Sequence, residues 1–175
     1  MILQQSTVIW SRILVYMLFL LFLCSCQQSS SIPTGFYGYE KEKAESAASE
    51  LSFSPDLPEY MPIETAFLIS DRYYLKDSGN EAMDISFYTE DNDLLSIQFI
   101  EGDIDPALVE ADTVMIGERL EGEYVDNSFA KILCWQQNGI TYKMSYRQNV
   151  LGVSEEQKNN VSKQDLVQTA RSFHS

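Results

Sequence analysis

Three acidic residues at alternate positions are the first candidates for chemistry in this chain. Glu101, Asp103 and Asp105 are each separated by one residue, a pattern that calcium loops use and that pairs of hydrolytic carboxylates can share. A calcium loop starting at Glu101, however, would have Pro106 where glycine is needed and Asp112 where glutamate is needed. Pairs of carboxylates are unavoidable among 26 acidic residues. The sequence therefore favours a solvated loop that keeps an edge strand from pairing.

Cys134 is the second candidate, because a thiolate can act as a nucleophile. It would need a histidine or another cation beside it, and the chain has one histidine, at position 174. Lys143, its expected cross-strand neighbour, could lower the thiol pKa slightly. We find neither a glycine-rich phosphate loop nor spaced metal ligands. The pattern favours a half-buried structural cysteine, and we expect no enzyme activity, cofactor or metal.

Charge is distributed unevenly along the 175 residues, which carry 12 basic and 26 acidic side chains for a net charge of −14. This balance excludes a nucleic-acid binder, which needs a basic surface. Residues 77–126 hold 15 acids and one base, whereas residues 127–175 hold three acids and six bases. A polarised domain can meet a charged partner, although acidity can also serve solubility alone. The candidate partner-binding residues are Asp91, Asp93, Glu101, Asp103 and Asp105.

The start of the chain predicts export. Residues 13–23 form an apolar run after Arg12, too short for a bilayer-spanning helix of about 20 residues. The motif Leu-Cys-Ser-Cys at positions 23–26 resembles the bacterial lipobox, in which the last cysteine is diacylated and the signal is cut before it. Cys26 is thus the expected lipidation site, on the outer face of the cell membrane. The alternative, an uncleaved anchor over 8–23, would bury Arg12 at a cost of about 2–3 kcal/mol.

Four segments follow from these patterns. Residues 1–25 are the predicted signal peptide, and residues 26–39 are the lipidated cysteine with a flexible tether rich in Ser, Gly and Gln. Residues 40–52 are strong helix formers with a narrow stripe of alanines, and this short helix could either dock or stay solvated. Residues 53–175 form an α+β domain, which begins with an extended, proline-rich segment over 53–62.

Alternating apolar residues predict the strands that position the candidate residues. Residues 65–75, 113–116 and 120–125 are predicted to form strands, and two hairpins have a defined register. The first pairs Phe87 with Leu95 around a loop over 90–92. The second turns at Asn138-Gly139 and pairs Trp135 with Tyr142 on a core face, leaving a mostly wet opposite face.

Ser162 can cap a final helix, with Asp165 at the third position. Strands followed by a helix predict an α+β fold with a curved antiparallel sheet of about six to seven strands, one face of which is covered by the C-terminal helix. A half-barrel is one form that such a sheet can take.

Several short motifs occur in a characteristic order. They are Pro-Glu-Tyr-Met-Pro at 58–62, Met-x-Ile-x-Phe at 83–87, Leu-x-Ile-x-Phe at 95–99, Val-x-Ile-Gly at 114–117 leading to Tyr124, Leu-x-Trp at 133–135 with Asn-Gly-Ile-x-Tyr at 138–142, and the helix at 165–173. Together they resemble domain-of-unknown-function family 4367, over roughly residues 45–174. The resemblance implies a Gram-positive lipoprotein or an extracytoplasmic, anti-sigma-factor-like domain with no agreed catalytic residues. The acidic loops and the insertion at 148–161 depart from that pattern.

Two functions are compatible with these observations. The first is a non-enzymatic, lipid-anchored envelope domain that binds another envelope protein or acts as a sensory module. The second is a half-barrel carrier or sensor that holds a lipid or peptide between sheet and helix. A carrier needs a mostly apolar cavity of roughly 300 Å³ or more, whereas an interaction module can have a filled core.

Overall fold

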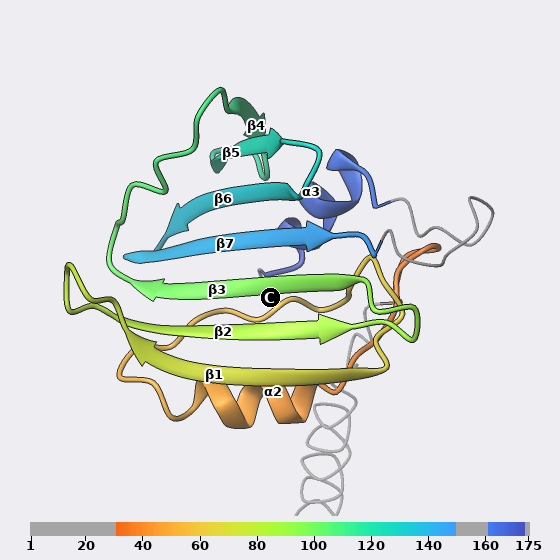
Figure 1. The fold of residues 1–175 in the computed structure, drawn as a ribbon, viewed down its shortest axis with the longest axis horizontal. Helices are drawn as coiled ribbons and strands as arrows, with labels where there is room; N and C mark the ends of the chain where they lie inside the picture. Colours follow the sequence, from red (N-terminus) through yellow and green to blue (C-terminus); the bar gives the residue numbers. More distant parts are fainter. Residues whose placement is uncertain (1–30, 150–160, 174–175) are drawn as a thin grey trace, which may run out of the picture. The chain divides into compact units, whose positions relative to one another are not determined.

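A computed structural model describes residues 31–149 and 161–173. Its seven strands form one open antiparallel sheet in the order β1-β2-β3-β7-β6-β5-β4, so β1 and β4 are the edges (Figure 1). The expected curved antiparallel sheet with a C-terminal helix is thereby confirmed. The described elements are α2 (Lys41–Ala48), β1 (Phe67–Tyr74), β2 (Glu81–Tyr88), β3 (Leu94–Glu101), β4 (Asp112–Met115), β5 (Glu121–Asp126), β6 (Lys131–Gln137), β7 (Ile140–Arg147) and α3 (Lys163–Arg171).

The two hairpins have the predicted registers. Phe87 faces Leu95, and Thr89 N–H donates to the carbonyl of Asp93 at 3.1 Å, which leaves a three-residue loop. Asn92 ends that loop with a left-handed φ of 63°, a conformation that asparagine tolerates. Trp135 faces Tyr142 across the second hairpin. Its turn residues, Asn138 and Gly139, both have positive φ, as a two-residue hairpin turn requires.

The two faces of the sheet differ in what covers them. We call the face that points toward α2 and α3 the inner face and the opposite one the outer face. The inner face carries apolar side chains that are fully buried, namely Ile85, Ile97, Leu133 and Met144. The outer face carries a row of mostly polar side chains paired across the strands, namely Asp71, Asp84, Gln98, Lys143, Cys134 and Glu123.

The C-terminal helix α3 closes one half of the inner face. Ser162 and Asp165 form the predicted capping box: the hydroxyl of Ser162 accepts from Asp165 N–H, and the Asp165 carboxylate accepts from Ser162 N–H at 2.7 Å. Phe173, just after the helix, meets the Trp135 ring edge-on at 5.0 Å. Trp135 stacks on Tyr142 at 5.0 Å. These rings hold α3 against β6 and β7, because buried aromatic pairs prefer such geometries.

The short helix α2, whose docking the sequence left open, packs against the other half of the inner face. Ala44 is completely buried in the common core, and Lys43 Nζ donates to the carbonyl of Leu68 in β1 at 3.0 Å. The proline-rich segment 53–62, which was expected to be extended, then crosses the inner face. Its Met61 is fully buried, and Asp56 N–H donates to the hydroxyl of Tyr142 at 3.2 Å.

The outer face of β6 and β7 is less exposed to solvent than the sequence predicted. Cys134 and Thr141 are each only 2% exposed, and residues 102–104 of the β3–β4 connection lie against Thr141. The Thr141 hydroxyl donates to the carbonyl of Gly102 at 2.8 Å and accepts from Ile104 N–H at 2.8 Å. This acidic loop leads from β3, inside the sheet, to the edge strand β4, but it forms its hydrogen bonds with β6 and β7. Its expected role of keeping an edge strand from pairing stays a prediction.

Candidate functional site

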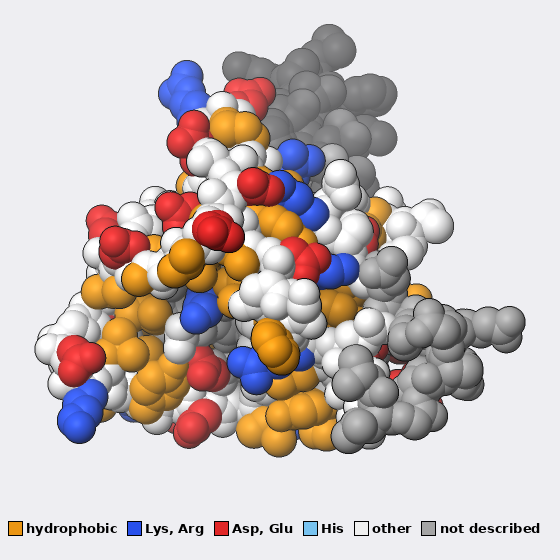
Figure 2. Space-filling view, turned by 45° about the horizontal axis from the view of Figure 1, so that its top comes forward, with side chains coloured by type: hydrophobic (Ala, Val, Ile, Leu, Met, Phe, Trp, Pro, Cys, Tyr) orange, Lys and Arg blue, Asp and Glu red, His pale blue; other side chains and the backbone are white. Residues whose placement is uncertain are grey.

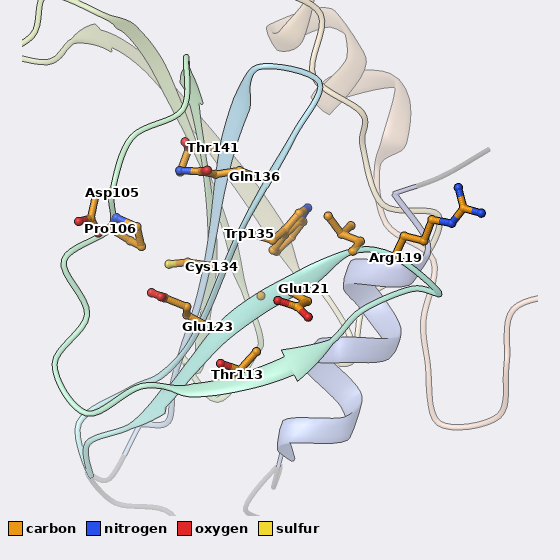
Figure 3. Close-up of a pocket in the computed structure, with 12 residues that line it drawn as sticks. Asp105, Pro106, Thr113, Arg119, Glu121, Glu123, Cys134, Trp135, Gln136 and Thr141 are labelled. Atoms are coloured by element: carbon orange, nitrogen blue, oxygen red, sulfur yellow. The ribbon is translucent and has the colours of Figure 1, made fainter.

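A cleft of about 570 Å³ lies between the β3–β4 connection and the strands β5 and β6. Figure 3 shows Cys134 and Glu123 pointing from these strands toward Asp105 and Pro106 of the connection. The lining is largely polar or charged, and consists of Asp105, Pro106, Thr113, Arg119, Leu120, Glu121, Gly122, Glu123, Cys134, Trp135, Gln136 and Thr141. The cleft thus gathers Cys134 and one of the predicted acids, Asp105.

Cys134 is a poor nucleophile in this setting. Burial raises the pKa of its thiol to about 11, the nearby Lys143 opposes that rise, and Glu123 adds to it. The expected lowering by Lys143 is therefore outweighed by desolvation, which disfavours the charged thiolate. At neutral pH the side chain is a neutral thiol, as a structural cysteine would be.

The alternating acids do not wrap around a common point. Gly102 N–H donates to the carbonyl of Gly139 at 2.7 Å, so the loop begins by pairing with the end of β7. The Asp105 carboxylate accepts from Ala107 N–H at 2.8 Å within its own turn. Across residues 31–149 and 161–173, no three His, Cys, Asp or Glu side chains are grouped as metal ligands could be.

The five predicted partner-binding acids do not form one surface. Asp91 lies in the β2–β3 loop, whereas Glu101, Asp103 and Asp105 lie at the other end of β3 (Figure 1). These four are exposed. Asp93 is only 3% exposed and accepts hydrogen bonds from Asn149 N–H at 2.8 Å and the Tyr146 hydroxyl at 3.2 Å. Its assignment to a partner surface was therefore wrong, because its carboxylate is used inside the fold.

The separation of acidic and basic residues along the sequence does not produce separate acidic and basic surfaces in the fold. Since β3 pairs with β7 and β6 with β5, the two strands from the basic part of the chain lie in the middle of the sheet, between strands from the acidic part. Lys163 at the start of α3 pairs with Asp112 of β4 at 2.9 Å. Figure 2 shows acidic side chains mixed with apolar and basic ones over the face in view, without a single acidic surface.

Two polar clusters near the β1 edge had no sequence signal. Glu81 is 1% exposed, pairs with Arg72 and accepts from Ser52 N–H at 2.7 Å; the bonds from Ser52 and then Arg72 lower its pKa. On the outer face, the Tyr73 hydroxyl donates to Asp84 at 3.0 Å and accepts from Gln98. Burial raises the pKa of Asp84 despite those bonds. Ser52 lies 29 positions from Glu81, and Gln98 lies 25 positions from Tyr73, so only the folded chain completes these clusters.

The predicted signal peptide and its lipidation site, Cys26, lie outside the described residues. Among the residues that are described, the helices are too short and too polar to cross a bilayer. Comparison of the chain with protein-family models, curated proteins and solved structures finds no match. The resemblance to domain-of-unknown-function family 4367 therefore stays a prediction from the motifs.

Proposed function

We propose that this protein is a non-enzymatic, lipid-anchored domain on the outer face of a Gram-positive cell membrane, where it acts as a protein-interaction or sensory module. The observation that carries the proposal is the asymmetry of the sheet. The inner face is filled, while parts of the outer face and most of β1 are accessible, with Phe67, Ile69 and Tyr74 exposed. Accessible apolar side chains of this kind are typical of protein contact sites.

The filled inner face weighs against the alternative of a lipid or peptide carrier. Such a carrier needs an apolar cavity between sheet and helix, but Trp135, Tyr142 and Phe173 occupy that space beside α3 with exposures of 3% or less. The proline-rich segment 53–62 covers the neighbouring part. The large cleft lies instead by the β3–β4 connection, and its charged lining is unsuited to an acyl chain.

The chemistry of the described side chains also supports binding over catalysis. The free thiol, Cys134, is kept neutral by burial, and the acids of the cleft are not arranged as metal ligands. The buried carboxylate of Glu81 is fully engaged by Ser52 and Arg72.

The membrane anchor is tested by replacing Cys26 with alanine in the native host. We expect the membrane-bound fraction to fall and the mature mass to lose a diacylglyceryl group. Cys24→Ala is the matched control, because that cysteine leaves with the signal peptide and the mature protein should be unchanged. An unaltered mass and membrane fraction for Cys26→Ala would overturn the lipoprotein assignment.

The interaction role is tested by crosslinking in intact cells. A variant with Glu101, Asp103 and Asp105 neutralised to Gln or Asn removes the exposed acids at one end of β3, and Asp91→Asn removes the one at the other end. If acids steer a basic partner, one variant should weaken its capture, most visibly at low salt. An identical set of crosslinked proteins for both variants and wild type would exclude steering by these acids. Stoichiometric lipid on the purified protein would instead support the carrier.

A further inference from the structure

The edge strand β1 is long and largely uncovered. It runs for eight residues, from Phe67 to Tyr74, and pairs only with β2. Of its side chains, Leu68 alone is buried, while Phe67, Ile69 and Tyr74 are 45%, 54% and 63% exposed. A long, exposed and partly apolar edge is a template for another strand.

The main chain of β1 has hydrogen-bonding groups that point away from the sheet. The Leu68 carbonyl is one of them, because it is reached from outside by Lys43 Nζ. Successive residues of an antiparallel strand alternate in direction, so the main-chain groups of Ser70, Arg72 and Tyr74 also point outward. Within the described chain these groups have no main-chain partner, since no strand lies beyond β1. An incoming strand can therefore pair from Ser70 onward without displacing Lys43.

The side chains beside this edge define what the incoming strand must carry. The outer face of β1 presents Phe67, Ile69, Asp71 and Tyr73 in one row, and Phe67 stacks on Tyr88 of β2 at 4.9 Å. Asp71 is exposed and lies opposite a second acid, Asp84. Neither carboxylate forms an ion pair with a described cation. Asp84 accepts a hydrogen bond from Tyr73 at 3.0 Å and is attracted by Lys143, whereas Asp71 is exposed. The row thus offers apolar contact near Ile69 and negative charge at Asp71.

A second copy of this chain would not place a basic side chain opposite the outer row of β1. Pairing β1 with itself would bring Phe67, Ile69, Asp71 and Tyr73 against the same four residues, and none of them is a cation. Arg72 is on the other face, where it is paired with Glu81. A strand with apolar and basic side chains two residues apart fits both Ile69 and Asp71, because cross-strand pairs of opposite charge are stabilising and like charges are not.

We propose that β1 is a docking edge that takes an extended segment of a partner protein as an eighth strand, with apolar and basic residues alternating along the outer face. This inference rests on the proposed interaction function and gives the chemistry of the partner. Main-chain hydrogen bonds to Ser70 and Arg72 supply affinity, and the row beside them supplies selectivity, as in other strand-addition complexes.

The test uses two synthetic peptides with the full mature protein in detergent. The first, Val-Thr-Lys-Thr-Val-Thr-Lys with blocked ends, carries the required row, and the second has glutamate for lysine. We expect the lysine peptide to slow hydrogen exchange over residues 69–74 at least tenfold at saturation. We expect the glutamate peptide to bind at least tenfold more weakly at low salt. Equal binding of the two, or slowed exchange elsewhere only, would overturn the proposal.

Two variants separate main-chain docking from charge. Ser70→Pro removes an outward N–H that the sheet does not use, so the fold should persist, as a thermal melt can verify, while peptide binding falls at least tenfold. Asp71→Asn should weaken only the lysine peptide, whereas Asp77→Asn, with the same charge change in the β1–β2 loop, should not. Wild-type binding by Ser70→Pro would overturn the proposal, as would concentration-dependent dimers that protect β1 without peptide. If the peptide experiments fail but Cys26 is lipidated and a partner is crosslinked in cells, the docking edge is overturned. The proposed interaction function would then remain and would use another surface.

Discussion

The two edges of the sheet are protected to very different extents. The β4 edge is four residues long, and Arg171 of α3 reaches across it, donating from Nε to the carbonyl of Ile116 at 2.5 Å and from Nη2 to that of Met115 at 3.3 Å. The β1 edge is twice as long, and Lys43 occupies one of its carbonyls. Arg171 of α3 thus binds two consecutive carbonyls at the end of the shorter edge, while Lys43 of α2 binds one carbonyl of the longer edge.

This difference matters because natural proteins usually shorten, charge or cover their edge strands to avoid unwanted pairing. At β4 the strand is short, and Arg171 binds the carbonyl of its last residue. At β1 the Arg72–Glu81 pair puts charge on the inner face, but the outer row remains partly apolar. The contrast between the two edges indicates that the accessibility of β1 is specific to that strand and is not a general property of the sheet.

The largest expected effect concerns the aromatic cluster that holds α3 against β6 and β7. Trp135→Ala removes the ring that contacts both Tyr142 and Phe173, and we expect a loss of about 3–5 kcal/mol in the free energy of unfolding, from lost burial and a cavity. Urea melts measure it. Gln136→Ala, an exposed neighbour on the outer face, should change stability by no more than about 0.5 kcal/mol. Equal losses would mean that the rings do not hold this half together.

A labelling experiment compares the two halves directly. We expect a cysteine introduced by Ser70→Cys at the open edge to react with iodoacetamide at pH 7.5 about 100-fold faster than the native Cys134, whose pKa is raised to about 11 by burial. Mass spectrometry of the modified peptides gives both rates in one sample. The difference should vanish in urea. A Cys134 that reacts as fast in the folded protein would contradict its burial in the sheet.

Removing the hydrogen bonds that Arg171 makes at the end of β4 should have a smaller effect. Arg171→Ala deletes both hydrogen bonds to the carbonyls of Met115 and Ile116, which we expect to cost about 1 kcal/mol and to speed hydrogen exchange of β4 more than of β1. Lys163→Ala, which removes the exposed pair with Asp112, should cost about 0.5 kcal/mol or less. Unchanged exchange of β4 in the arginine variant would remove the distinction between the two edges.

The smallest effect is the pH dependence of Asp84, on the outer face near β1. Burial raises its pKa in the folded state, so folding favours the protonated form. Its contribution is fully present below the unfolded pKa and is lost as the pH rises through the folded one. Asp84→Asn should therefore be more stable than wild type at pH 7, by about 0.5 kcal/mol, and the difference should shrink toward pH 4. A difference that is constant with pH would contradict this assignment.

Local features of this fold were predictable from sequence. Alternation of apolar residues set the Phe87–Leu95 register, and Asn138-Gly139 set the second hairpin, because both signals act over a few neighbouring residues. The capping box at Ser162 is equally local. These features sufficed for the α+β class and for the burial of the core face.

Features that depend on distant contacts were not predictable. The burial of Asp93 requires Tyr146 and Asn149, which approach it only after β3 pairs with β7. The hydrogen bonds of Thr141 require the β3–β4 connection to lie on it, and no periodicity encodes that path. The accessibility of β1 likewise depends on strand order, which local patterns do not specify. The sequence thus identifies the candidate acids, but it does not predict which of them lie together in the fold.

The strand order also has a consequence for how the chain folds. The strands β1 to β3 and β4 to β7 are two consecutive meanders, each made of neighbouring hairpins, and a single pairing of β3 with β7 joins them. The residues that meet there are 39 to 53 positions apart, so this joint carries most of the loop-closure entropy of the sheet. We therefore expect both meanders to form early and their joining to set the rate of folding, because long-range strand pairing is the slow step in such topologies.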